Sequence, residues 1–67
     1  MRKKQARHII EDWLKVLEWP SVPSNNEPFK QNELSDIITQ ERNLSALDRE
    51  MIKETIQEMA AEKSERR

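Results

Sequence analysis

Four glutamates recur every four residues in the last third of the chain, at Glu50, Glu54, Glu58 and Glu62. Residues four apart lie on one face of an α-helix, so these carboxylates form an acidic ridge if the segment is helical. Like charges at this spacing repel one another weakly. The pattern is typical of a solvated helix face, or of a surface for a basic partner such as a DNA-binding regulator or the basic end of a second copy.

Four cations, Arg2, Lys3, Lys4 and Arg7, gather near residue 1. In a helix they would lie at its N-terminus, where the helix dipole disfavours positive charge. A phosphate group or an acidic protein surface would offset that cost, and a solubilising tail is the alternative. Because residues 8–65 carry net negative charge and repel phosphate, we rank nucleic acid below protein as the partner.

The composition excludes most catalytic chemistry. The 67 residues include one histidine, no glycine and no cysteine, which excludes thiol catalysis, thiolate metal sites, disulfides and glycine-rich phosphate loops. His8 stands one helical turn before Asp12 without a ligand cluster or a nucleophile, so we interpret it as a surface histidine. A chain of this size in three helices seldom encloses a pocket, and we expect no enzyme, no cofactor and no metal.

Apolar side chains at helical spacing predict a long first helix over residues 3–19, which Pro20 ends because it disfavours helical geometry at the preceding residue. Its apolar stripe comprises Ala6, Ile9, Ile10, Trp13, Leu14, Val16 and Leu17. Residues 20–28 hold all three prolines and predict a loop. A short second helix should follow over 28–42, capped by Asn26, with Pro28 in its first turn. Its small core face comprises Leu34, Ile37 and Ile38, with Phe29 at the entry.

Asn43 suits a left-handed helix stop, and Ser45 suits the N-cap of a long third helix over 46–62. Residues 63–67 form a charged, basic tail that should fray. The apolar positions of the third helix are Leu47, Met51, Ile52, Thr55, Ile56, Met59 and Ala60.

These elements predict an all-α fold, a single small three-helix domain over residues 1–67. Only 34% of the residues are hydrophobic and 37% are charged, which makes the core thin. We therefore expect the chain to complete its core by dimerisation or in an obligate complex with another protein. No apolar run approaches the roughly 20 residues that span a bilayer, and the acids Glu11 and Asp12 interrupt any signal peptide or presequence. The expected location is the cytoplasm.

Residues Leu44-Ser45-Ala46-Leu47-Asp48-Arg49-Glu50-Met51-Ile52 resemble the opening of the last DNA-binding region of bacterial sigma factors, in which a Leu-Ser or Leu-Thr entry precedes an acid-Arg-Glu helix. In that family a second, recognition helix follows. Here residues 60–67 are too short and too charged to supply it, so no function is carried over from the resemblance.

The function that the sequence favours is that of a small intracellular regulatory protein, most specifically an inhibitor or modulator of a DNA-binding or transcription protein. Its predicted protein-binding residues are Trp13, Leu17, Trp19, Met51, Glu54, Glu58 and Met59. Trp19 lies off the first stripe, and the sequence leaves open whether it folds back over the loop or anchors an interface. One alternative is a homodimeric DNA-binding protein that grips phosphates with Arg2, Lys3, Lys4 and Arg7, and another is a structural subunit of a larger assembly.

Overall fold

The computed structural model describes the backbone of residues 1–65 and the side chains of residues 1–62. It has three helices, α1 (Lys3–Val16), α2 (Pro28–Arg42) and α3 (Ala46–Glu65), and no strand among the described residues. The predicted all-α class is confirmed. Compared with the expected ranges, α1 ends at Val16 rather than at 19, and α3 continues through 63–65, which were expected to fray. Residues 66–67 of that predicted tail lie outside the described residues.

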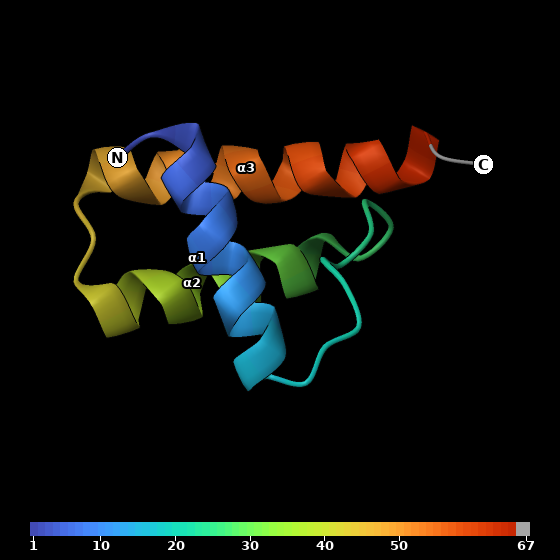
Figure 1. Ribbon diagram of the computed structural model, residues 1–67, viewed down its shortest axis with the longest axis horizontal. Coiled ribbons are helices and arrows are strands. Elements are labelled where there is room, and N and C mark those ends of the chain that lie inside the picture. The colour runs from blue at the N-terminus through green and yellow to red at the C-terminus, as the bar shows by residue number, and fades with distance from the viewer. Residues whose placement is uncertain (66–67) are drawn as a thin grey trace.

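The three helices form an antiparallel hairpin with a third helix laid across it. Figure 1 shows α2 and α3 side by side, joined by a short turn, and α1 crossing both of them. All three pairs of helices are in contact. The radius of gyration is 11.1 Å, close to the roughly 11 Å expected of a compact chain of this length. One copy therefore reaches a compact shape, and completion of the core by a second chain stays a prediction.

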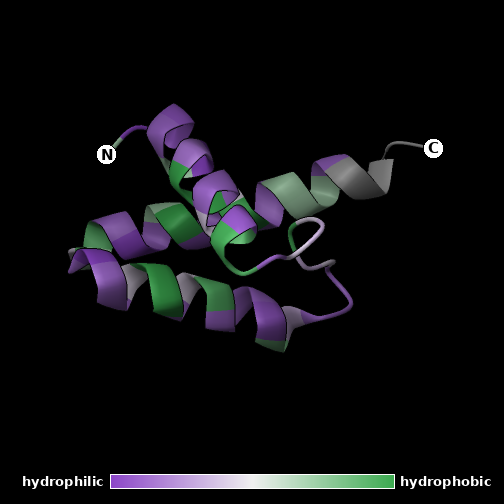
Figure 2. Cartoon of the chain, turned by 60° about the horizontal axis from the view of Figure 1, so that its bottom comes forward, coloured by the Kyte–Doolittle hydropathy of each residue, from purple (hydrophilic) through white to green (hydrophobic). Residues whose placement is uncertain are grey.

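The core lies where the three helices meet. Its side chains are apolar and come from every helix and from the connector between α1 and α2: Ala6, Ile9, Ile10, Leu14, Val22, Leu34, Ile38, Ile52, Ile56 and Ala60. Hydrophobic and hydrophilic bands alternate along α1 and α2, as Figure 2 shows. This amphipathic pattern lets one face of each helix enter the core while the other meets water.

Three apolar side chains that the sequence assigned to the core or its edge are exposed instead: Val16 (68%), Phe29 (65%) and Leu47 (84%). At about 100° per residue, Leu47 lies about 140° around α3 from the buried Ile52, so it cannot share the core face. Val16 similarly lies about 120° around α1 from Ile10. Val16 and Leu47 were placed in the apolar stripes of their helices from spacing alone. Each stripe is wider than the part of the helix that the core covers.

The end of α1 is set by its own turn and not only by Pro20. Glu18 adopts a left-handed conformation with φ of 59°. Its N–H donates to the carbonyl of Lys15 at 3.1 Å, and the N–H of Trp19 donates to the carbonyl of Leu14 at 2.9 Å. These two bonds are those of a Schellman motif, in which glycine is the usual left-handed residue. A residue with a Cβ in this conformation costs about 1–2 kcal/mol.

The start of α2 differs from the expectation at one residue. The N-cap is Glu27, not Asn26, and it makes no side-chain capping bond. The N–H of Glu27 already donates to the carbonyl of Ser24 at 2.9 Å, which places a turn before the helix and moves its start one residue later. Pro28 occupies the first turn as predicted, where its missing N–H leaves no bond unmade.

A buried glutamine holds the connector against α2. Gln31 is 8% exposed, and its Nε2 donates to the carbonyls of Pro23 at 3.1 Å and Ser24 at 3.0 Å and to Oδ1 of Asn25 at 3.2 Å. Loop carbonyls buried without such a donor would be costly. The proline-rich segment is therefore tied to α2 by one side chain.

The turn between α2 and α3 is the one that the sequence predicted. Asn43 has φ of 52° and ψ of 50°, the left-handed stop expected of it. The hydroxyl oxygen of Ser45 accepts a hydrogen bond from the N–H of Asp48 at 3.3 Å, which confirms Ser45 as the N-cap. This short turn brings α2 and α3 side by side.

Candidate protein-binding surface on the third helix

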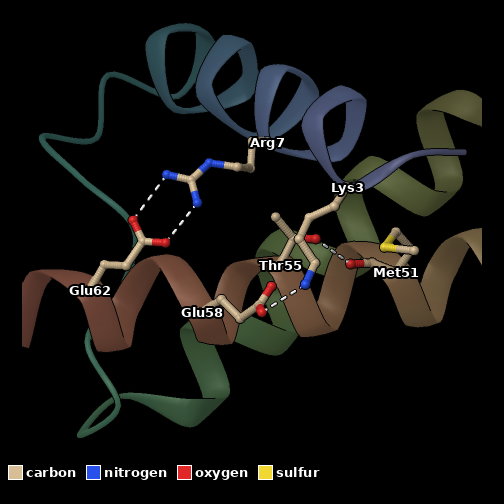
Figure 3. A network of polar contacts seen from close by, with 6 residues as sticks. All are labelled: Lys3, Arg7, Met51, Thr55, Glu58 and Glu62. Carbon is tan, nitrogen blue, oxygen red and sulfur yellow. Dashed lines mark hydrogen bonds and ion pairs between the residues drawn. The ribbon is translucent and has the colours of Figure 1, made fainter.

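The basic start of the chain and the acidic ridge meet across the α1–α3 contact. Nζ of Lys3 donates to Oε1 of Glu58 at 2.8 Å. The two terminal nitrogens of Arg7 donate to the two carboxylate oxygens of Glu62 at 2.7 and 3.0 Å. Figure 3 shows both pairs bridging the two helices. Two cations one turn apart on α1 therefore match two carboxylates one turn apart on α3.

The contacts favour the charged forms of both cations. The hydrogen bond to Glu58, reinforced by the negative charge of that carboxylate, raises the pKa of Lys3 above its ordinary value of 10.5. The hydrogen bond to Glu62 and its charge likewise raise the pKa of Arg7. Both side chains stay well exposed to water, so solvent screens these attractions. They direct how α1 lies on α3 more than they stabilise the fold.

Helix α3 takes part in most of the ion pairs among the described residues. The α-amino group of Met1 lies 3.5 Å from Oδ1 of Asp48, and Nη2 of Arg49 lies 2.9 Å from Oδ1 of Asp36 on α2. Together with Lys3–Glu58 and Arg7–Glu62, these pairs mean that α3 supplies one member of every ion pair between residues far apart in the sequence in the described part of the chain. The helix orders its neighbours through charge as well as through the core.

The other half of the acidic ridge has no such partner. Glu50 and Glu54 are exposed, and neither makes a hydrogen bond or an ion pair among the described residues, although Glu54 attracts Lys3 more weakly from a distance. Leu47, with 84% of its surface exposed, precedes Met51 by one turn, and Met51 is half-buried against the core. We call Leu47, Glu50, Met51 and Glu54 the outer α3 face. It combines apolar surface with uncompensated negative charge.

The predicted protein-binding side chains fall into two groups. Trp13, Leu17, Trp19, Met51 and Met59 are half-buried and pack against the core of their own chain. The two glutamates of that prediction lie outside the core, Glu54 without a paired cation among the described residues and Glu58 in its pair with Lys3. The core therefore covers much of the surface that the aromatic and methionine side chains were expected to offer.

Trp19 is half-buried and packs against the core, and its role as an interface anchor stays a prediction. It lines an open hollow of about 440 Å³ with Pro20, Val22, Pro23 and other residues of the loop, together with Lys30 of α2 and Ala60 of α3. The hollow brings together prolines, a tryptophan and the exposed Lys30–Glu27 ion pair, 3.1 Å long. It holds no convergent set of catalytic groups.

The four cations predicted to bind phosphate are divided by the fold. Lys3 and Arg7 are used in the α1–α3 ion pairs, whereas Arg2 and Lys4 are exposed without an ion pair among the described residues. Arg2 and Lys4 border a shallow hollow of about 330 Å³ with Gln5 and the exposed His8. A phosphate would therefore meet two of the four cations unless α1 gave up its contacts with α3.

The described residues contain no group of three or more His, Asp or Glu side chains placed to hold a metal ion. Within the same part of the chain, none of the helices combines the length and apolar character needed to cross a bilayer.

Sequence reasoning missed that the two charge clusters bind each other. The signal was present, because Lys3 and Arg7 have the same four-residue spacing as Glu58 and Glu62. The spacing does not give the crossing position of α1, and this position decides which carboxylates the cations reach.

Comparison of the chain with known protein families, curated proteins and solved structures finds no match.

Proposed function

We propose that this chain is a small cytoplasmic regulatory protein that acts by binding another protein. In its most specific form, the proposal is that it inhibits or modulates a basic DNA-binding or transcription protein. The observation that carries it is the division of the acidic ridge, in which Glu58 and Glu62 are neutralised by α1 while Glu50 and Glu54 are left without paired cations beside the exposed Leu47.

Two properties of this surface support protein binding. Charge complementarity steers a basic partner to an acidic face and raises the rate of association. Exposed apolar side chains at the same place supply area whose burial stabilises the complex. A DNA-binding protein is the natural class of basic partner, since its own surface is arranged to meet phosphate.

The alternative of a homodimeric DNA-binding protein has less support. Its four proposed phosphate ligands include Lys3 and Arg7, and both are hydrogen-bonded to carboxylates of α3. Phosphate would have to displace Glu58 and Glu62 to reach them. A structural subunit of a larger assembly remains a third proposal, which shares the protein-binding surface but not the regulatory role.

The test is a binding assay with three readouts. The immobilised chain should capture a defined DNA-binding or transcription protein from a lysate of its own source. The purified pair should form a saturable complex, and formation of that complex should change how the partner binds DNA. If the captured protein is unrelated to DNA, or its DNA binding is unaffected by the complex, the specific proposal is wrong.

Two further measurements separate the alternatives. A gel shift with the chain alone tests direct DNA binding, which should fall steeply with salt and vanish on deletion of residues 1–7 if the DNA-binding alternative is correct. Sedimentation velocity from about micromolar to about millimolar concentration tests self-association. A monomer that gives no gel shift is the result expected of a regulator that pairs with a different protein.

A further inference from the structure

We infer that the outer α3 face docks a basic helix of the partner protein, one that carries two Lys or Arg side chains four residues apart beside an apolar side chain. This inference rests on the proposed function and specifies the site and the chemistry of the partner.

The contact between α1 and α3 is a template for the docking. On α1, Lys3 and Arg7 stand four residues apart, and each reaches one of two glutamates four residues apart on α3, at 2.7 to 3.0 Å. Glu50 and Glu54 repeat the same spacing along the ridge. A second helix that crosses α3 as α1 does, with two cations one turn apart, would meet them with the same register, because the helical repeat sets both spacings.

Apolar contact distinguishes this half of the ridge from the half that α1 covers. Leu47 is the most exposed of the large hydrophobic side chains among the described residues, and Met51 presents part of its surface one turn further along. Exposed ion pairs alone contribute little to affinity. A partner helix with an apolar side chain next to its cations buries Leu47 as well, and this burial supplies the larger part of the binding.

The described cations of a second copy fit the face poorly. Two pairs of Lys or Arg four residues apart occur within the described residues, Lys3 with Arg7 and Arg49 with Lys53. The first pair is bound to Glu58 and Glu62. In the second pair Arg49 is bound to Asp36, and Lys53 is half-buried. Neither of these two pairs is free, so the occupant we infer is a different protein that brings its own basic helix. Lys63 and Arg67 share the spacing but lie outside the described side chains, and self-association in sedimentation velocity would point to a second copy instead.

The probe is a synthetic, stapled, alanine-rich helical peptide with two lysines four residues apart and one leucine on the same face. Stapling is needed because a short free helix is marginal in water. A control peptide of equal composition places its lysines two residues apart, on different faces. Fluorescence anisotropy of the labelled peptides, titrated with the full chain, gives the dissociation constants. The first peptide should bind, and the control peptide should bind at least several-fold more weakly.

The variants test the face itself. Glu50→Gln with Glu54→Gln removes the two carboxylates that the peptide lysines are expected to pair with, and should weaken peptide binding about fivefold. Leu47→Ser should weaken it about tenfold. The matched control is Glu33→Gln with Glu41→Gln, which removes two exposed α2 carboxylates that have no ion pair among the described residues, and it should leave binding unchanged. Circular dichroism should show equal helicity for all variants, since none of these side chains is buried.

The inference is overturned if the two double variants weaken binding equally, because net charge and not the face would then be responsible. It is also overturned if the peptides with different lysine spacing bind alike, or if binding of Leu47→Ser equals that of the wild type. Once a partner protein is in hand, the same variants distinguish failure of this docking site from failure of the proposed function. If a complex forms and its affinity is unchanged by Glu50→Gln with Glu54→Gln and by Leu47→Ser, this docking site is disproved and the proposed function stands. Failure to find any protein partner disproves the function itself.

Discussion

The guanidinium of Arg7 on α1 donates two hydrogen bonds to the carboxylate of Glu62 on α3, one at 2.7 Å and one at 3.0 Å. Two parallel bonds fix the relative orientation of both groups, which a single contact with a lysine does not. One turn earlier on each helix, Lys3 meets Glu58. Lys3 and Arg7 are therefore paired inside the molecule, and their two glutamates are the C-terminal half of the ridge, which leaves the N-terminal half to other uses.

The Lys3–Glu58 contact should give the fold a dependence on alkaline pH. Because the contact raises the pKa of Lys3 in the folded chain above its ordinary 10.5, its stabilising effect is complete below pH 10.5 and is lost as the pH rises through the folded value. Lys3→Arg keeps its charge at pH 11 and should lose less stability between pH 9 and pH 11 than the wild type. Lys4→Arg is the matched control, since Lys4 has no ion pair among the described residues. Thermal melts followed by circular dichroism measure the difference, and equal behaviour of the two variants would disprove the effect.

Glu18→Gly should stabilise the protein by about 0.5–1 kcal/mol, although it removes a side chain and adds a flexible residue. The gain arises because glycine adopts φ of 59° without the steric cost that the Cβ of Glu18 imposes. Urea unfolding gives the free energy of unfolding. Glu18→Ala keeps a Cβ and should show no comparable gain, so a gain of equal size in both variants would point to the lost charge instead.

Ser35→Ala should stabilise the fold by about 1 kcal/mol. The side chain of Ser35 is 1% exposed, and its hydroxyl makes no hydrogen bond to the described residues, so the alanine removes a buried polar group that has no partner. The free energy of unfolding from chemical denaturation is again the measurement. A destabilised variant would show that the hydroxyl makes a bond in solution.

The same substitution at Ser45 should have the opposite effect. The Ser45 hydroxyl accepts the N–H of Asp48 at the start of α3, and Ser45→Ala should cost about 1 kcal/mol of stability. Ser45→Asp retains an acceptor and also places a negative charge at the helix N-terminus, so it should restore most of the loss. If Ser45→Asp and Ser45→Ala are equally unstable, the cap does not contribute.

Gln31→Leu should loosen the connector. Leucine keeps the size of the side chain but leaves the carbonyls of Pro23 and Ser24 without their donor, at an expected cost of about 1–3 kcal/mol. Hydrogen exchange should accelerate at the N–H of Glu27, which is part of the turn that Gln31 braces. Exchange at the N–H groups in the middle of α3 should change only as far as global stability falls.

Local features of this protein followed from the sequence because they depend on neighbouring residues. Asn43 and Ser45 mark the end of α2 and the start of α3 by chemistry that operates within one turn of helix. Pro28 marks the first turn of α2 in the same way. The all-α class follows from the helical spacing of the apolar residues, which needs no knowledge of the partner surface.

The tertiary structure decided what depends on the crossing of the helices. The sequence contains the cations at Lys3 and Arg7 and the ridge of glutamates, but only the position of α1 across α3 assigns them to Glu58 and Glu62 and leaves Glu50 without a cation. The same packing exposes Leu47, because the core covers a narrower face of α3 than the apolar spacing suggested. Charges and apolar side chains are properties of residues, whereas the contacts that neutralise or bury them are properties of two surfaces brought together.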